Sequence, residues 1–406
     1  MIELWKVFRL TLVAALLKQV PRENHRSLYE RINWKNRLIG IIGGRGTGKT
    51  TLLLQHLAEK SLYSSKYLYI SADNIRVEAI GIYEIASQFF RMGGEVIIID
   101  EIHKYARWPQ EIKNLYDSFP SAKILFSGSS TLGLQLGKAD LSRRAVFYTL
   151  PGLSFREYLL LARNVKLPAI TLAGLLKEHA RLTSEVLVEG PVLGLFRDYL
   201  EHGIYPFFVE GIEEYLAKLR NIIEKTLYED IVSTTSIKSS NVPMLKRILW
   251  LIATSQPFEP NLVRISNNLG LSKPTLYGHL DYLERAGLLS GVMLEGSGFK
   301  LVRKPVKIYI ENTNLLRAIA GELSREDPVG TVRETFIQHQ LISVGLQVRI
   351  PSRGDFLVED KYLLEVGGSC KGKKQIAGKE NAYIVKDDID MGFGNVIPMW
   401  LFGFLY

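Results

Sequence analysis

Residues 43–50 carry the strongest chemical signal in the chain, because they match the pattern G-x-x-x-x-G-K-[ST] in full. An apolar run at 38–42 precedes them and a helix-forming run at 50–60 follows, which is the strand–loop–helix order that the motif requires. In such a loop the backbone N–H groups turn inward on a phosphate, and the helix N-terminus favours negative charge. The predicted nucleotide-binding residues are Gly43, Gly44, Arg45, Gly46, Thr47, Gly48, Lys49, Thr50 and Thr51.

Two side chains of this loop have specific predicted roles. Lys49 would neutralise the β- and γ-phosphates of ATP, and the Thr50 hydroxyl would bind Mg²⁺. The alternative is a glycine-rich turn with a chance lysine. The strand and helix that flank the motif argue against that alternative, so we predict a site for ATP and Mg²⁺.

Two acids, Asp100 and Glu101, end a second apolar run at residues 95–101. Buried parallel strands are typically continuous apolar runs. Ligand sites of open α/β sheets lie at the carboxyl ends of the strands. We therefore expect Asp100 to hold the Mg²⁺ shell, and Glu101 to orient and deprotonate the attacking water. The alternative, two solvated acids at a strand end, is weak beside a complete phosphate-binding motif.

Three further side chains could serve the same site. Ser127 belongs to another apolar strand with a polar end, 123–130, and could contact the γ-phosphate or the water. Arg143 and Arg144 precede the last strand of this region and could form an arginine finger, offered to the nucleotide of a neighbouring subunit in a homo-oligomer. The alternative for the arginines is a solvated loop pair, because arginines are mostly exposed.

The last hundred residues hold a third group of acids. Glu334 lies in a predicted helix, Asp355 begins a predicted strand, and Glu365 ends the next one. This layout is typical of a metal-dependent nuclease core, which binds Mg²⁺ through hard oxygen ligands. These three acids are therefore a possible second metal site.

Such a core also needs a lysine two residues after its last acid, and Gly367 occupies that position. A nearby lysine could replace the missing one, or it could only contact phosphates; the candidates are Lys371, Lys373 and Lys374. We expect a nucleic-acid-binding domain without nuclease activity.

The elements that position the first site alternate short apolar runs with helix-forming runs. Strands separated by helices predict a parallel, doubly wound α/β sheet. The expected strands are 38–42, 66–70, 95–101, 123–130 and 145–150, with helices at 79–92 and 109–118.

The rest of the chain predicts further domains. Ser272 can cap a helix, Pro274 suits its first turn and Gly287 ends it, and a basic hairpin strand follows, which is a winged helix-turn-helix pattern. The predicted parts are an amphipathic helix and lead-in (1–35), a P-loop ATPase core (36–150), a helical lid on the nucleotide side (151–238), the winged helix (239–310) and an endonuclease-like domain (311–406).

The charges of the winged helix point to DNA, with a protein–protein module as the alternative. On the predicted recognition helix, Asp281 and Glu284 offset the positive charge of Lys273 and Arg285, which favours the alternative. The wing favours DNA because it carries Lys300, Arg303, Lys304 and Lys307.

Composition sets the class of protein. The chain has 406 residues and a net charge of +9, which favours several domains and an anionic partner. The single cysteine, Cys370, excludes internal disulfides and fits the reducing cytoplasm. No run reaches the roughly 18 apolar residues of a transmembrane helix, so we expect no integral membrane segment. Residues 2–19 predict an amphipathic helix packed on the ATPase core, with a membrane-surface anchor as the alternative.

Together these segments resemble a group of prokaryotic, especially archaeal, P-loop ATPases with an AAA-type core, a winged helix and a C-terminal restriction-endonuclease-like domain. The resemblance covers nearly the whole chain. It implies that the strand of Ser127 lies between the P-loop strand and the Asp100 strand, with Glu101 as the catalytic acid. Besides the P-loop, the matching motifs are IDEIHK (99–104), SGSS (127–130), LSRR (141–144), PGLSFREY (151–158), EVGG (365–368) and IPMWLFGFLY (397–406).

The leading hypothesis is an Mg²⁺-dependent ATPase whose nucleotide cycle is coupled to DNA. The rivals are an ATP-dependent switch without turnover that recruits a protein partner, and an ATP-gated nuclease. Glu101 argues against the switch, because a switch needs no residue that activates water.

Overall fold

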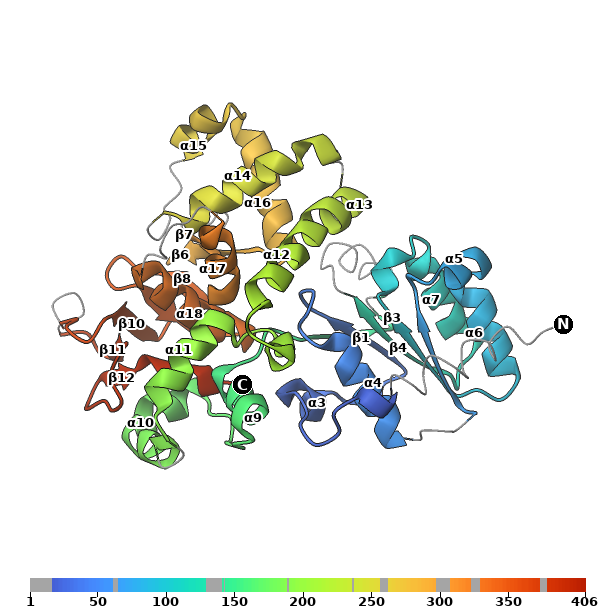
Figure 1. The fold of residues 1–406 in the computed structure, drawn as a ribbon, viewed down its shortest axis with the longest axis horizontal. Coiled ribbons are helices and arrows are strands. Elements are labelled where there is room, and N and C mark those ends of the chain that lie inside the picture. The colour runs from blue at the N-terminus through green and yellow to red at the C-terminus, as the bar shows by residue number, and fades with distance from the viewer. Residues whose placement is uncertain are drawn as a thin grey trace. The chain divides into compact units, whose positions relative to one another are not determined.

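The computed structural model describes residues 17–60, 65–128, 141, 143–187, 190–235, 237–255, 262–296, 307–322, 329–372 and 378–406. The chain divides into two compact units, Met1–Pro151 and Gly152–Tyr406 (Figure 1). Most of the predicted amphipathic helix at 2–19 lies outside the described residues. So do Lys300, Arg303 and Lys304 of the predicted wing, and Lys373 and Lys374.

The described part of unit 1 contains a five-stranded sheet in the order β2-β3-β4-β1-β5, and all of its strand pairs are parallel. This confirms the predicted parallel α/β sheet. β4 lies between β1 and β3, the order that the resemblance implies. The strands are β1 (Leu38–Ile42), β2 (Tyr67–Ser71), β3 (Val96–Asp100), β4 (Lys123–Gly128) and β5 (Val146–Thr149).

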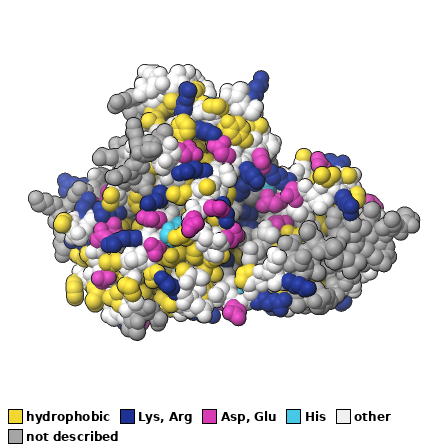
Figure 2. Space-filling view, viewed as in Figure 1, with side chains coloured by type: hydrophobic (Ala, Val, Ile, Leu, Met, Phe, Trp, Pro, Cys, Tyr) yellow, Lys and Arg dark blue, Asp and Glu magenta, His cyan; other side chains and the backbone are white. Residues whose placement is uncertain are grey.

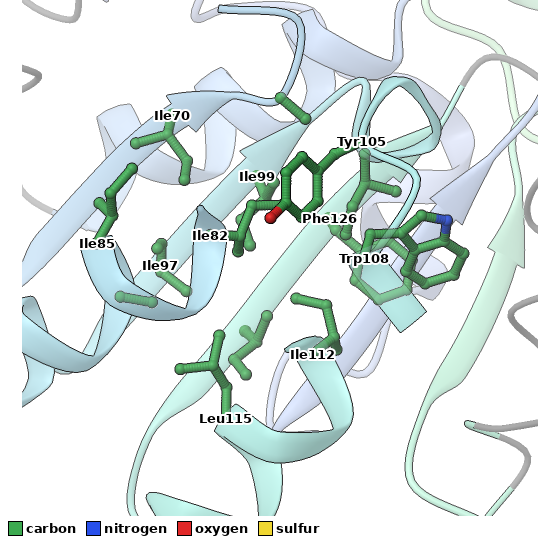
Figure 3. Close-up of a cluster of buried hydrophobic side chains, with 14 of the residues drawn as sticks. Ile70, Ile82, Ile85, Ile97, Ile99, Tyr105, Trp108, Ile112, Leu115 and Phe126 are labelled. Atoms are coloured by element: carbon green, nitrogen blue, oxygen red, sulfur yellow. The ribbon is translucent and has the colours of Figure 1, made fainter. Parts of the chain in front are cut away.

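Helices cover both faces of this sheet. Successive strand side chains point to opposite faces, so neighbouring residues of one strand belong to different buried clusters. Ile97 and Ile99 of β3 belong to one buried cluster, together with side chains of α6 (Ile82–Arg91) and α7 (Trp108–Ser118) (Figure 3). Ile98 belongs to the opposite cluster, with α4 (Lys49–Lys60) and α3 (Ser27–Arg31). Each fully buried isoleucine stabilises the fold by roughly 1.5–3 kcal/mol.

The single helix predicted at 79–92 is wrong in one respect. The chain forms two helices here, α5 (Ile75–Ile80) and α6, separated by Gly81. Gly81 has a φ of 97°, which a helical residue cannot adopt and which glycine tolerates because it has no Cβ. The side chain of Asn74 caps α5 by accepting from the Arg76 N–H.

Unit 2 begins with the helices that the sequence predicts as a lid. Ser154 opens α9 with a capping box, in which its side chain and that of Glu157 each bind the other residue's backbone N–H. Within the unit, the Phe155 ring packs edge-on against Phe404, so α9 lies against the segment Met399–Phe404. The helices are α9 (Phe155–Arg163), α10 (Leu172–Leu187), α11 (Val192–His202), α12 (Tyr215–Lys225) and α13 (Val232–Thr234).

Among the described residues, three α-helices and two strands lie in the region of the predicted winged helix. α15 (Leu262–Leu269) leads through Gly270, whose φ is 63°, into α16 (Lys273–Arg285), and the Ser272 side chain caps α16 by accepting from the Thr275 N–H. The other elements are α14 (Val242–Ala253), β6 (Leu289–Leu294) and β7 (Lys307–Ile310).

β6 also joins the last sheet of the chain. β6 pairs antiparallel with β7 and parallel with β8, so the sheet continues across the domain boundary predicted at residue 310. Among the described residues this sheet has the order β12-β11-β10-β9-β8-β6-β7. Its further elements are α17 (Thr313–Gly321), α18 (Val329–Ser343), β8 (Val348–Ile350), β9 (Phe356–Val358), β10 (Tyr362–Gly367), β11 (Ala382–Lys386) and β12 (Val396–Pro398).

Within the described ranges, none of the helices has the length and apolar character needed to cross a membrane.

Candidate functional site

The phosphate-binding loop turns between β1 and α4, and its glycines are needed there. A Cβ on Gly43 would lie 2.3 Å from the carbonyl oxygen of Leu150, so a side chain at this position would collide with backbone. Gly46 and Gly48 have φ values of 79° and 94°, which other residues rarely adopt. The loop conformation therefore depends on these three positions.

The polar side chains of the loop fold back on its own backbone. The Lys49 ammonium donates to the Gly44 carbonyl oxygen at 2.6 Å, and the Thr47 hydroxyl donates to the same oxygen at 3.0 Å. Lys49 and Thr47 are both buried. The lysine is thus held inside the loop, beside the backbone that would surround a phosphate.

Asp100 is the centre of the site at the carboxyl end of the sheet. Its carboxylate accepts from the Thr50 hydroxyl at 2.6 Å and from the Tyr69 hydroxyl at 2.9 Å. The Ser127 hydroxyl donates to the other carboxylate oxygen. Thr50 and Asp100, the two predicted Mg²⁺ ligands, are therefore in direct contact.

The sequence reasoning did not identify Tyr69. Burial, and then the nearby Asp100 carboxylate, raise the pKa of its hydroxyl, so Tyr69 stays a neutral donor. The residue lies in β2, where Ser71 is the partner of Asp100 in the strand register. The sequence shows Tyr69 only as a tyrosine in an apolar strand. That this strand lies beside β3 cannot be predicted from local sequence patterns.

Glu101 follows β3 in a left-handed conformation, with φ 51° and ψ 37°. Few residues other than glycine adopt it, and its cost of about 1–3 kcal/mol must be offset by neighbouring contacts. Its N–H donates to the Ser127 hydroxyl at 3.2 Å, so one serine holds the backbone of Glu101 and the carboxylate of Asp100.

The Glu101 carboxylate also has a side-chain neighbour, His103, which the sequence reasoning did not use. His103 Nε2 lies 3.5 Å from Glu101 Oε2. The histidine side chain is 2% exposed and the glutamate side chain is 25% exposed. The carboxylate can therefore be reached by water while the histidine limits its orientation.

The two arginines of the predicted finger have different environments. The Arg144 guanidinium binds both carboxylate oxygens of Asp117 at 3.0 Å, and this contact holds the pKa of Asp117 below its usual value. The Arg144 side chain is therefore bound to Asp117 of α7 in the same unit. Arg143 is exposed, which makes it the better candidate of the pair for a contact in trans.

In unit 2, Asp355 lies near both of the other C-terminal acids. Burial raises the pKa of Glu334 and of Glu365, and the charge of Asp355 contributes to both shifts. Asp355 accepts from the Val366 N–H at 2.7 Å. The structure thus brings the three predicted acids of this group into one neighbourhood.

A lysine does reach these acids, although Gly367 lacks one. Lys371 Nζ lies 2.6 Å from Glu365 Oε1, and a Cβ on Gly367 would lie 2.6 Å from Lys371 Cδ. The Lys371 side chain therefore fills the space that a side chain at position 367 would enter. A second ammonium, that of Lys307, lies 3.3 Å from Glu334 Oε2.

The described residues contain no group of three or more His, Cys, Asp and Glu placed to hold a metal ion. The possible second metal site at Glu334, Asp355 and Glu365 stays a prediction. Lysine ammonium groups lie beside Glu334 and Glu365, and Lys371 is one of the lysines that could replace the one missing at position 367.

The predicted recognition helix, α16, exposes its N-terminal residues. Ser272, Lys273 and Thr275 are exposed, whereas Leu276 and Leu283 are buried. At the other end of the helix, Arg285 is bound to Asp281 at 2.9 Å, so its charge is offset within α16. On the face drawn in Figure 2, basic side chains are interspersed with acidic ones.

Two family models match parts of this chain. Residues 35–159 match an AAA domain, and residues 193–326 match a domain of unknown function, DUF8612. The uncharacterized protein MJ1637 of Methanocaldococcus jannaschii is 27% identical over 96% of this chain and 89% of that protein. The uncharacterized HTH-type transcriptional regulator MJ0229 of the same organism is 35% identical over 83 residues, 20% of this chain and 84% of that protein.

Solved structures with some likeness include the Walker-type ATPase PABY2304 of Pyrococcus abyssi. That structure is 14% identical, with a TM-score of 0.46 over 75% of this chain and 99% of that chain. AMPPCP-bound DnaA from Aquifex aeolicus is 16% identical, with a TM-score of 0.27 over 66% of this chain and 86% of that chain. The match to the family model and the geometry of the loop agree on one conclusion. Residues 35–159 contain an AAA-type P-loop domain similar to those of ATPases.

Proposed function

We propose that this protein is an Mg²⁺-dependent ATPase whose nucleotide cycle is coupled to DNA binding. One observation carries the proposal. The Thr50 hydroxyl lies 2.6 Å from the Asp100 carboxylate. Thr50 is the residue after Lys49, and Glu101 is the residue after Asp100. Phosphate binding, metal binding and water activation are thus assigned to side chains of one sheet edge.

The loop would bind the phosphates of ATP. Its backbone N–H groups and the Lys49 ammonium supply positive charge, and the N-terminus of α4 adds the favourable end of the helix dipole. Lys49 now binds the Gly44 carbonyl, and the charged γ-phosphate is the stronger acceptor. Binding would therefore move the ammonium from the carbonyl to the phosphate.

Thr50 and Asp100 fit a magnesium ion because hydroxyl and carboxylate oxygens are its preferred ligands. The ion, when bound there, would neutralise charge on the β- and γ-phosphate oxygens. Tyr69 and Ser127 hold the Asp100 carboxylate from both sides, so its oxygens are oriented before any ligand arrives.

Glu101 would accept the proton of the attacking water. Its carboxylate is partly exposed, its backbone is fixed by Ser127, and His103 limits its position. Such a positioned acid supports turnover over a switch that only binds ATP.

The DNA part of the proposal rests on α15 and α16. The capped N-terminus of α16 is exposed, with Lys273 at its first position, and 83 residues of the chain are similar to a helix-turn-helix type transcriptional regulator. The N-terminal residues of a recognition helix are those that meet base edges in the major groove.

The test is ATP turnover by the full chain with and without duplex DNA, in Mg²⁺. We expect turnover that requires Mg²⁺ and changes when DNA is added, and a Lys49→Ala variant that neither binds nor hydrolyses ATP. Turnover that is equal with and without DNA would contradict the coupling. Turnover that persists in Lys49→Ala would contradict the assignment of the site.

The same proposal assigns no strand cleavage to the C-terminal acids, because Gly367 occupies the position where such a core carries its lysine. Lys371, which reaches Glu365, is the lysine that an ATP-gated nuclease would use instead. We expect no nicking of plasmid DNA in Mg²⁺ or Mn²⁺. Nicking that disappears in Asp355→Ala or Glu365→Ala would make the protein an ATP-gated nuclease instead.

A further inference from the structure

We propose that Arg26 is a positioning residue that fixes the phosphate-binding loop and connects it to the junction between the two units. This inference rests on the nucleotide binding proposed above. The Arg26 guanidinium donates to the Thr47 carbonyl oxygen at 2.6 Å and to the Pro151 carbonyl oxygen at 2.8 Å. Thr47 is in the loop, and Pro151 is the last residue of unit 1. Arg26 itself is 8% exposed.

The contact to Thr47 controls a backbone N–H. A trans peptide unit is planar, so its C=O and N–H groups point in opposite directions. By holding the Thr47 carbonyl on one side, Arg26 directs the Gly48 N–H to the other side. The N–H groups of such a loop are its phosphate ligands, and Arg26 therefore sets the direction of one of them.

This is also the part of the loop with the greatest intrinsic freedom. Thr47 lies between Gly46 and Gly48, both with positive φ, and glycine loses more conformational freedom on ordering than other residues. A buried, planar guanidinium that binds the carbonyl between them reduces this freedom before the nucleotide arrives. Preorganised ligands cost less free energy to bind.

The contact to Pro151 extends the same tie to the end of unit 1. The Leu150 N–H donates to the Ile42 carbonyl oxygen at 2.7 Å. The Leu150 carbonyl oxygen lies so near Gly43 that a Cβ there would come within 2.3 Å of it. Leu150 is thus bound through its backbone to Ile42, just before the loop, and Pro151 is linked through Arg26 to Thr47 within the loop. Because one guanidinium binds both carbonyl oxygens, a shift of the Thr47 peptide on nucleotide binding would move the group that holds Pro151.

The test is hydrogen exchange of the full chain with and without a non-hydrolysable ATP analogue in Mg²⁺. In the wild type, we expect the analogue to protect peptides of the loop and also to change exchange in peptides covering 145–155. Arg26→Ala should bind the analogue about tenfold more weakly, the loss expected for one charge-assisted hydrogen bond. At saturating analogue it should protect the loop but leave exchange at 145–155 unchanged.

Two variants keep the test sharp. Arg26→Lys can reach one carbonyl oxygen but lacks the fork needed for two, so it should recover part of the affinity without the change at 145–155. Arg31→Ala removes an exposed arginine from α3 and should behave as the wild type. A wild-type response at 145–155 in Arg26→Ala or Arg26→Lys would overturn the connection. Absence of loop protection in the wild type would instead overturn nucleotide binding, and this inference with it.

Discussion

At the scale of single residues, the Asp100 carboxylate is shared by side chains from three other elements. Thr50 comes from α4, Tyr69 from β2 and Ser127 from β4. Each contact restricts the carboxylate, and each comes from a segment that is distant in the sequence. The orientation of the predicted metal ligand is therefore a property of the packed sheet.

Glu101 gives the sharpest prediction at this scale. Glu101→Gln keeps the shape of the side chain but removes its ability to accept a proton, so turnover should fall by roughly 10²-fold or more. ATP affinity should stay close to that of the wild type, because the phosphate ligands are unchanged. Equal loss of affinity and turnover, measured by equilibrium binding and steady-state kinetics, would contradict the role of Glu101.

Lys371 and Glu365 give a prediction about pH. Glu365 is fully buried, and its carboxylate is compensated by the Lys371 ammonium. Lys371→Met should lower the free energy of unfolding by about 2 kcal/mol at neutral pH, because it leaves a buried charge unpaired.

The sign of the pH effect follows from the pKa of Glu365, which burial already raises. A raised folded-state pKa favours the protonated acid, so the loss in Lys371→Met should shrink as pH falls below that pKa. The double variant Glu365→Gln/Lys371→Met should recover stability at neutral pH. A loss that does not depend on pH, in denaturant titrations, would contradict this account.

At the scale of elements, α16 carries two basic side chains in different environments, one at its capped N-terminus and one paired with an acid near its other end. Lys273 is exposed at the N-terminus, and Arg285 is paired with Asp281. If α16 docks on DNA by its N-terminus, Lys273→Ala should make the slope of log K against log salt shallower by about 0.9.

Arg285→Ala is the matched control on the same helix and should change the slope less. The wing residues Lys300, Arg303 and Lys304 stay a prediction: replacing all three should reduce the slope by roughly two to three units. Salt-insensitive or absent DNA binding would assign the winged helix to a protein partner.

At the scale of the whole molecule, the two arginines predict how copies of the chain cooperate. If Arg143 is a finger in trans, activity should rise steeply with protein concentration, and Arg143→Ala should lower it by roughly 10³-fold. Arg144→Ala should have a much smaller effect on turnover, because Arg144 is bound to Asp117.

A mixture of Arg143→Ala and Lys49→Ala chains should recover turnover, since each chain supplies what the other lacks. A rate per chain that is independent of concentration, without recovery on mixing, would show that Arg143 is a solvated residue.

The sequence by itself determined the parallel sheet of unit 1, because buried strands and a complete phosphate-binding motif leave patterns along the chain. It also determined the Ser272 cap of α16, since capping depends on neighbours within a few residues. Only the tertiary structure decided which side chains meet Asp100, that Arg144 is bound to Asp117, and that Lys371 fills the space at Gly367. These contacts join residues that are separate in the sequence, and they depend on strand order, strand register and packing, which local patterns do not encode.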